Sequence, residues 1–218
     1  MEARTVPART SRVAAEPTAT PDGARAPAAP APVADPGPLG LAAFALTTFV
    51  LSMFNAGLVS DKGEPVVFGL ALAYGGLAQV LAGMWEFRTG NTFGAVAFTS
   101  YGAFWLSFWA FVQFYAPKIP TTDTGHAVGL FLIAWGIFTA YMFIASLRTT
   151  AAISLVFVLL TATFLVLGIA DAGGNTSLTK LGGWLGLATA AAAWYASFAG
   201  VTNATFGRVI LPVRPLRR

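Results

Sequence analysis

The sequence has no cysteine, a single histidine and few charged residues. Of its 218 residues, 10% are Asp, Glu, Lys or Arg and 56% are hydrophobic, and the mean hydropathy is +0.68. Without cysteine, the chain can form neither a disulfide nor a thiolate metal site. Soluble domains carry about 25% charged residues, so this chain has too few charges to cover a water-facing surface.

Long stretches without charge alternate with short breaks. Six windows lack any Asp, Glu, Lys or Arg: 39–60, 66–85, 89–117, 124–147, 149–170 and 181–207. A helix needs about 20 apolar residues to span the hydrocarbon core of a bilayer. The pattern predicts an all-α polytopic membrane protein with six transmembrane helices. We expect these helices over about 39–59, 66–85, 94–115, 126–147, 151–170 and 181–201.

The chain divides into three parts by composition. Residues 1–34 hold six of its 13 prolines and show no apolar periodicity, so they predict a disordered tail that buries too little apolar surface to fold. Residues 35–208 form the transmembrane domain, and residues 209–218 a basic C-terminal tail. Breaks rich in Gly, Pro, Asn and Asp separate the predicted helices, such as Asp171-Ala172-Gly173-Gly174-Asn175.

The positive charges predict the orientation of the chain. With the N-terminus inside, ten arginines lie on the inner side: Arg4, Arg9, Arg12, Arg25, Arg88, Arg148, Arg208, Arg214, Arg217 and Arg218. The outer side holds three lysines, Lys62, Lys118 and Lys180. Basic residues favour the cytoplasmic side, so we expect both termini in the cytoplasm and a multi-pass protein of the plasma (inner) membrane. Because the charges follow the helix ends and do not alternate with aromatic residues, the net charge of +4 does not indicate nucleic-acid binding.

Catalytic and cofactor-binding patterns are missing. No lysine lies within a predicted span to form a Schiff base, and one histidine cannot supply both ligands of a bis-histidine haem. No Ser-His-Asp set, HExxH or phosphate-binding loop is present, and Glu86 and Asp171 stand at span ends. We therefore expect no enzyme activity, no cofactor and no metal, and a path for a small polar solute instead.

Polar residues inside the predicted spans are candidates for this path. Phe44, Thr48, Ser52 and Asn55 share one face of the first helix, next to Thr47. Asn in lipid needs a partner, and both interhelical hydrogen bonding and a water-accessible path remain open here. The other candidates are Gln79 in the second helix, and Thr99, Ser100 and Tyr101 in the third.

At these residues the sequence resembles the acetate uptake transporter family, which includes acetate–succinate permeases. The resemblance covers about residues 35–213. It rests on four motifs: the signature Asp35-Pro36-Gly37-Pro38-Leu39-Gly40-Leu41, where the family has Asn-Pro-Ala-Pro-Leu-Gly-Leu; Tyr74-Gly75-Gly76 followed by Gln79; GNTFGAVAFTSYGAFWLSF (90–108); and FGRVILPV (206–213).

This resemblance implies a fold, an activity and partners. It implies six helices per protomer, each protomer with its own path, assembled as a homohexamer in the lipid bilayer. It implies uptake of acetate, and of succinate in some members, together with protons. It further implies a constriction formed by Phe44, Tyr101 and Leu160.

Two residues depart from the family pattern: Asp35 replaces Asn, and Phe54 stands where bacterial relatives often have His. A carboxylate at Asp35 would repel acetate, and it could instead accept a hydrogen bond at the start of the first helix. The leading hypothesis is a proton-linked monocarboxylate transporter. The alternatives are a passive acetate channel and, from another class, a non-transporting scaffold or sensor.

Overall fold

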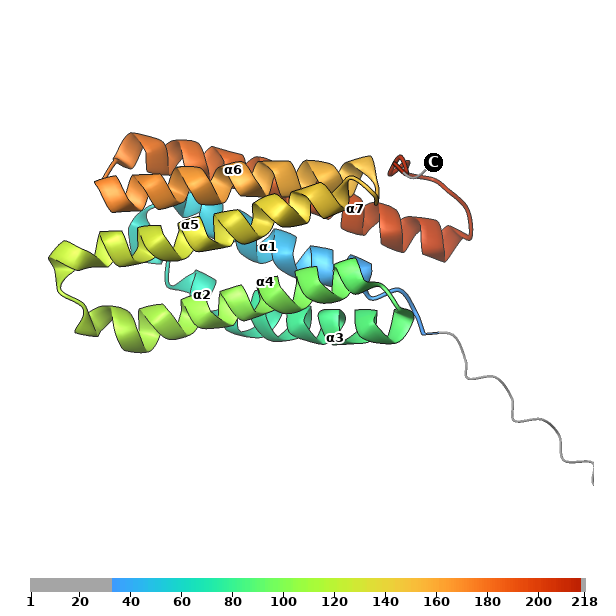
Figure 1. Ribbon diagram of the computed structural model, residues 1–218, viewed down its shortest axis with the longest axis horizontal. Helices are drawn as coiled ribbons and strands as arrows, with labels where there is room; N and C mark the ends of the chain where they lie inside the picture. Colours follow the sequence, from blue (N-terminus) through green and yellow to red (C-terminus); the bar gives the residue numbers. More distant parts are fainter. Residues whose placement is uncertain (1–32, 217–218) are drawn as a thin grey trace, which may run out of the picture. The chain divides into compact units, whose positions relative to one another are not determined.

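The computed structural model describes residues 33–216 as a bundle of six helical spans (Figure 1). All six are long and apolar enough to cross a membrane, which confirms the predicted number of transmembrane helices. The predicted tail over residues 1–34 lies almost wholly outside the described residues. The spans are Gly37–Asn55, Val66–Thr89, Thr92–Lys118, Thr121–Ser146, Ala151–Gly173 and Thr176–Phe206.

Two of the spans contain segments of non-α helix. The second consists of α2 (Val66–Leu72), the π-helical η2 (Ala73–Ala78) and α3 (Gln79–Thr89), and the third of α4 (Thr92–Ala110), the π-helical η3 (Phe111–Tyr115) and the 3₁₀ turn η4 (Ala116–Lys118). The other spans are α1 (Gly37–Asn55), α5 (Thr121–Ser146), α6 (Ala151–Gly173) and α7 (Thr176–Phe206), and a 3₁₀ turn, η1 (Asp61–Gly63), follows α1.

Local sequence determines where these helices begin and end. Gly90 closes α3 in the left-handed conformation (φ 77°), and the Asn91 side chain accepts a hydrogen bond from Gly94 N–H at the start of α4. Asn175 caps α7 in the same way. The observed α5 and α7 begin about five residues before the predicted positions. The difference arises because the apolar windows exclude polar residues, whereas the first turn of a helix can hold them at a capped or solvated end.

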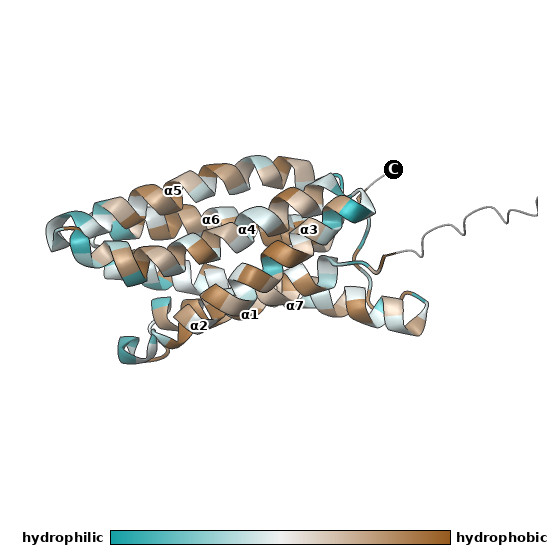
Figure 2. Ribbon diagram, turned by 90° about the horizontal axis from the view of Figure 1, so that it is seen from below, coloured by the Kyte–Doolittle hydropathy of each residue, from teal (hydrophilic) through white to brown (hydrophobic). Residues whose placement is uncertain are grey.

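Hydrophobic residues cover the middle of the bundle, while hydrophilic residues gather at its two ends (Figure 2). Large side chains such as Leu130, Ile144 and Phe198 are 61–71% exposed. In water such a surface would be unstable, but in a bilayer it faces hydrocarbon. The distribution is that of a membrane-embedded bundle.

The helices pack unevenly around the bundle. The helix backbones approach each other most extensively between α5 and α6, α1 and α7, α6 and α7, and α3 and α4, whereas α4 and α5 are joined mainly through aromatic side chains. The arrangement places α1 between the α5–α6–α7 group and the α3–α4 pair (Figure 1).

Close approach of α3 and α4 depends on Gly83. A Cβ at Gly83 would lie 2.5 Å from the backbone nitrogen of Thr99 and would also strike the Thr99 hydroxyl. Small residues allow membrane helices to approach this closely. Thr99 is thus enclosed by the neighbouring helix.

Residues 207–216 return across the end of the bundle where α7 finishes. Asn203 Oδ1 accepts hydrogen bonds from the amides of Ile210 and Leu211, at 2.7 and 3.0 Å. Farther along, Arg214 C=O accepts from Ala151 N–H and Thr149 C=O accepts from Leu216 N–H, both at 2.9 Å. The segment predicted as the start of a tail is therefore joined to the turn between α5 and α6.

The packing at Gly83 generates a stability prediction. Gly83→Ala should lower the free energy of unfolding by about 1–3 kcal/mol, because an added methyl group must displace backbone. Gly173→Ala is the matched control, since nothing lies within 4 Å of the Cβ added there. Thermal unfolding of the purified protein in detergent measures both. Equal melting temperatures for the two variants would contradict the close contact.

Candidate functional site

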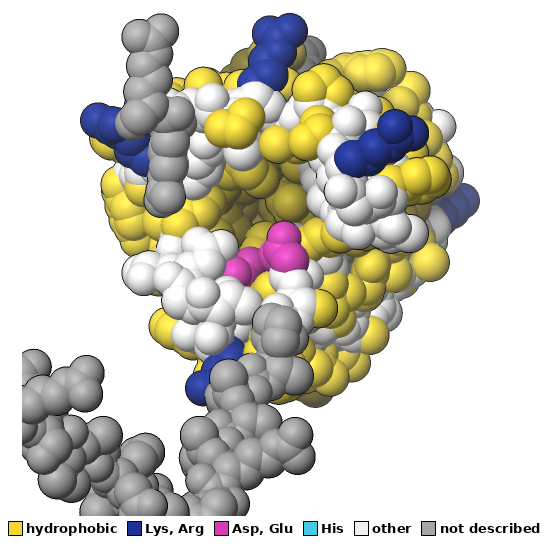
Figure 3. Space-filling model, turned by 90° about the vertical axis from the view of Figure 1, so that its right-hand side faces the viewer, with side chains coloured by type: hydrophobic (Ala, Val, Ile, Leu, Met, Phe, Trp, Pro, Cys, Tyr) yellow, Lys and Arg dark blue, Asp and Glu magenta, His cyan; other side chains and the backbone are white. Residues whose placement is uncertain are grey.

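A cavity of about 300 Å³ opens at the end of the bundle where α1, α4 and α6 begin. We call it the vestibule. Figure 3 looks at this end and shows a hollow with mainly hydrophobic walls and acidic side chains at its mouth. The lining residues are Asp35, Gly37, Pro38, Leu41, Phe44, Gln79, Glu86, Asn91, Phe93, Gly94, Ala97, Phe98, Tyr101, Thr149, Thr150, Ile153, Val156, Phe157, Leu160, Ala196 and Gly200.

Three of the helices that line the vestibule, α1, α4 and α6, contribute a series of residues to its wall. The residues that line it follow each helix inward and end at Phe44 on α1, at Tyr101 on α4 and at Leu160 on α6. These are the three residues that the family resemblance assigns to the constriction. The structure thus brings them together at the inner limit of one cavity, and we call them the neck.

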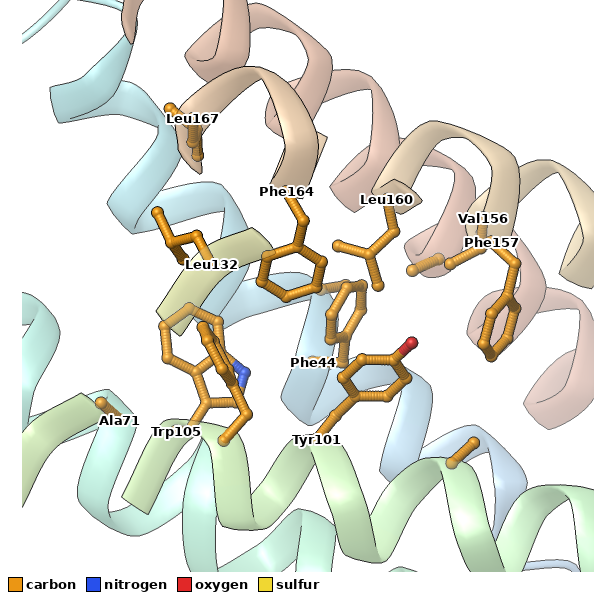
Figure 4. Packing of buried hydrophobic residues seen from close by; sticks show 14 of the residues in the cluster. Phe44, Ala71, Tyr101, Trp105, Leu132, Val156, Phe157, Leu160, Phe164 and Leu167 are labelled. Atoms are coloured by element: carbon orange, nitrogen blue, oxygen red, sulfur yellow. The ribbon is translucent and has the colours of Figure 1, made fainter. Parts of the chain in front are cut away.

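The neck is apolar and tightly packed. The rings of Phe44 and Tyr101 lie 5.8 Å apart at 52°, and Leu160 points toward both (Figure 4). All three side chains are at most 4% exposed. An ion with its hydration shell could not pass here without losing water.

A hydrogen bond to α5 fixes the Tyr101 ring. Its hydroxyl donates to Thr139 Oγ1 at 2.9 Å, and the Thr139 hydroxyl donates to the Trp135 carbonyl at 2.7 Å. A buried Tyr hydroxyl needs such a partner. Because both bonds hold the ring in one position, Tyr101 forms a defined wall of the neck.

Two carboxylates stand at the mouth of the vestibule. Glu86 is 1% exposed, and its Oε2 accepts hydrogen bonds from Asn91 Nδ2 at 2.9 Å and Thr89 Oγ1 at 3.1 Å. Asp35 Oδ1 accepts from Gly37 N–H at 2.8 Å, so it satisfies an amide at the start of α1 as the sequence suggests. A Cβ on Gly37 would lie 3.0 Å from Asp35 Oδ1 and 3.4 Å from Glu86 Oε1, so the two carboxylates border the same point.

An amide side chain lies beside the neck. Gln79 is 1% exposed and lines the vestibule, and its Oε1 has no hydrogen-bond partner among the described residues. It is the first residue after the π-helical η2. Segments of π-helix are frequent at functional sites, and here η2 immediately precedes an amide that lines the vestibule.

Comparison with known proteins shows the family of this chain. Residues 17–218 match the model of the GPR1/FUN34/yaaH family. The chain belongs to this family. The succinate-acetate/proton symporter SatP of Escherichia coli (strain K12) is 40% identical over 183 residues, which cover 83% of this chain and 95% of that protein.

Two further relatives extend the comparison. A solved structure described as the bacterial acetate channel SatP matches with a TM-score of 0.77 and 39% identity, covering 84% of this chain and 99% of that one. The ammonia transport outward protein 2 of Saccharomyces cerevisiae is 45% identical over 183 residues, which cover 80% of this chain. The chain spans only 65% of the length of that yeast relative.

The signature motif, residues 35–41, lies at the start of α1 beside the vestibule. Pro36 precedes α1, and Pro38 lies in its first turn. The Pro38 carbonyl accepts a hydrogen bond from Ser197 on α7 at 2.7 Å, whereas Leu39 is 46% exposed. A Cβ at Gly40 would lie 2.6 Å from the Phe98 ring, so the motif holds α1 against both α7 and α4.

Most of the predicted polar path residues lie outside the vestibule. Of the seven, only Gln79 lines it. Thr47 packs against Gly75 and Thr99 packs against Gly83, both in the second span, so closely that a Cβ on either glycine would clash with the threonine.

The remaining four path residues lie on α1 and α4. Ser52 packs closely against Gly186 of α7. Thr48 is buried, and Asn55 and Ser100 are half-buried. The first helix thus uses two of its hydroxyls, Thr47 and Ser52, at helix contacts.

Sequence reasoning missed Thr139 and the position of Glu86 in the vestibule. Thr139 stands alone in an apolar helix without any motif. Glu86 precedes the GNTFG motif, in which Asn91 caps α4 and also donates a hydrogen bond to the Glu86 carboxylate. The short distance in sequence between Glu86 and this motif could have indicated that they lie together. Within residues 33–216 no three His, Asp or Glu side chains gather as a metal site.

The bond between Tyr101 and Thr139 generates a second stability prediction. Tyr101→Phe should lower the free energy of unfolding by about 0.5–1.5 kcal/mol, the usual net value of one such hydrogen bond. Tyr141→Phe, at a side chain that is 53% exposed, should change it little. Denaturant titration in mixed micelles compares the two, and a loss for Tyr141→Phe as large as for Tyr101→Phe would argue against the bond.

Proposed function

We propose that this protein carries acetate and similar small monocarboxylates across the membrane through the vestibule and the neck, together with protons. The observation that carries this proposal is the convergence of Phe44, Tyr101 and Leu160 at the inner limit of one cavity. An apolar neck of this kind admits a small solute that can shed its water. The names of the bacterial relatives, an acetate symporter and an acetate channel, support the same substrate.

The charge of the vestibule favours passage of the protonated acid. Burying an unpaired carboxylate costs far more free energy than burying a neutral acid, and the neck offers no positive charge. Glu86 and Asp35 at the mouth would repel the anion. A proton that travels with the substrate removes both penalties, which is why we favour proton-linked transport. Succinate, which the Escherichia coli relative's name includes, would have to lose two charges.

The orientation and the assembly belong to the same proposal. Arg88, Arg148, Arg208 and Arg214 lie near the end of the bundle that carries the vestibule, and the positive-inside rule would place this end in the cytoplasm of a plasma (inner) membrane. A homohexamer, which the family resemblance implies, would give six separate paths. Cross-linking in native membranes tests the assembly.

The direct test is flux into liposomes that contain the purified protein. Labelled acetate should enter faster than in protein-free liposomes, with competition by propionate, lactate and succinate measured in parallel. Absence of protein-dependent flux from a correctly assembled sample would instead favour a scaffold or sensor.

Membrane potential separates the symporter from the channel. Transport of one proton with each acetate moves no net charge, so a potassium diffusion potential set with valinomycin should leave the rate unchanged at fixed internal and external pH. A passive acetate channel conducts an anion, and its flux would follow the potential.

Ammonium is a second candidate substrate. Two carboxylates at the mouth would attract a cation, and the yeast relative is named for ammonia transport. Labelled methylammonium, tested in the same liposomes, distinguishes the two substrates. Flux of methylammonium without flux of acetate would overturn our assignment.

A change at the neck should alter selectivity. Phe44→Ala removes one ring of the neck and should raise the rates of lactate and succinate relative to acetate several-fold, because larger acids would then fit. Phe206→Ala is the control, since that ring is 64% exposed at the end of α7. Competition assays in liposomes measure the ratio, and an unchanged ratio in Phe44→Ala would count against this neck.

A further inference from the structure

The last helix carries an exposed apolar surface of the length of the membrane core, with a basic residue at each end. Exposed large hydrophobic side chains extend along α7 from Leu181 to Val201. With the rise of an α-helix this stretch is about 30 Å long, which matches the hydrocarbon core of a bilayer. Lys180 directly precedes the stretch, and Arg208 follows it after the helix ends. Arg208 therefore lies about 10 Å beyond the core, at the level of the lipid headgroups.

Hydrogen bonds hold the turn that carries Arg208 in place. Gly207 ends α7 in the left-handed conformation (φ 63°). Asn203 then binds the chain after the turn, because its Oδ1 accepts from the amides of Ile210 and Leu211 and its Nδ2 donates to the Leu211 carbonyl at 2.9 Å. Since these bonds fix the turn before any ligand arrives, binding there costs little additional ordering entropy.

Residues 207–210, which we call the α7 turn, combine a charge with an exposed apolar side chain. Arg208 is exposed, and no carboxylate among the described residues pairs with it. The amide N–H groups of Arg208 and Val209 likewise donate to no residue that the structure describes. The Val209 side chain is 75% exposed, although hydrophilic residues gather at the ends of the bundle (Figure 2). A cation and unpaired donors next to an exposed aliphatic group suit the boundary between lipid phosphates and acyl chains.

The charges at this end of the protein separate by sign. Figure 3 shows the acidic side chains at the mouth of the vestibule and the basic side chains around the periphery. The acidic residues at the mouth, Asp35 and Glu86, accept hydrogen bonds from their own surroundings and do not neutralise Arg208. An anionic headgroup is therefore attracted to the periphery and repelled from the mouth.

We propose that the α7 turn binds the headgroup of an anionic phospholipid. The Arg208 guanidinium donates to the phosphate oxygens, and the Val209 side chain lies against the first carbons of an acyl chain. Phosphatidylglycerol has the same phosphate as phosphatidylcholine but lacks the choline cation beside it, so Arg208 prefers phosphatidylglycerol. The bound lipid holds the end of the last helix at the membrane surface, whichever solute the protein transports.

Photo-cross-linking identifies the molecule at the α7 turn. Val209 is replaced by p-benzoylphenylalanine in vesicles of equal amounts of phosphatidylglycerol and phosphatidylcholine with identical acyl chains, and intact mass spectrometry identifies the adduct. The phosphatidylglycerol adduct should exceed the phosphatidylcholine adduct about threefold to fivefold, the effect of one basic residue near the membrane surface. Ile137 is the control position, because its side chain is 64% exposed in the middle of α5, where both lipids should react equally.

Arg208→Gln tests whether the arginine causes this preference. The change should make the two adducts at position 209 nearly equal and leave the melting temperature in detergent unchanged, since no described residue pairs with Arg208. Lys118→Gln is the matched control, because it removes one positive charge at the opposite end of the bundle, where Lys118 Nζ lies 5.5 Å from the centre of the Tyr115 ring. Its preference at position 209 should stay as in the wild-type background. An equal loss in both variants would mean that net charge alone attracts the lipid, which would overturn the site.

A second copy of the chain is the other occupant that the same experiment detects. A cross-linked dimer at position 209 in place of a lipid adduct would put that copy at the α7 turn and overturn the lipid site. Equal adducts of the two lipids at position 209, without any further substitution, would overturn it as well. Neither result changes the proposed transport function, which the flux assay tests separately.

Discussion

Hydrogen bonding without water is the constraint on which this structure depends. In the hydrocarbon core each polar group must find its partner within the protein, and several threonine and serine hydroxyls of the described spans find it one turn back in their own helix. Thr47 donates to the Ala43 carbonyl, and Thr139 donates to that of Trp135. Such residues can lie at helix contacts without a cost in unpaired groups. A hydroxyl that bonds within its own helix is therefore weak evidence by itself for a solute path.

The packing around α4 is uneven. Glycines let α4 approach α3 so closely that Thr99 is enclosed against Gly83, whereas larger aromatic side chains separate the backbones of α4 and α5. The same helix α4 thus contributes one face to a dense contact and another, with Phe98 and Tyr101, to the vestibule. The Tyr101 hydroxyl spans the sparse side to reach Thr139. Aromatic side chains, among them Tyr101, Trp135 and Phe138, thus join α4 to α5 at the level of the neck.

The sequence predicted the membrane spans, and the family resemblance picked out Phe44, Tyr101 and Leu160, which line one cavity in the structure. Charge-free windows locate helices well because a single Lys or Asp in hydrocarbon is expensive. The rotation of each helix was not predictable in this way: Thr47 and Thr48 are adjacent, yet one faces Gly75 and the other has no partner. Trp105 read as one of many aromatic residues, because only packing reveals whether an indole N–H finds an acceptor. The hydrogen bond from Asn91 to Glu86 was not predictable either, because it depends on the left-handed turn at Gly90 that brings the Asn91 side chain to the carboxylate.

The segment after α7 links distant parts of the chain mechanically. Asn203 holds residues 210 and 211, the Tyr195 hydroxyl donates to the Pro212 carbonyl at 2.7 Å, and the strand-like pairing of Pro215 with Thr150 completes the connection. Thr149 and Thr150 also form part of the rim of the vestibule. A tilt of the last turns of α7 would therefore displace Thr149 and Thr150 through these bonds. The width of the vestibule's opening would then change with the position of α7.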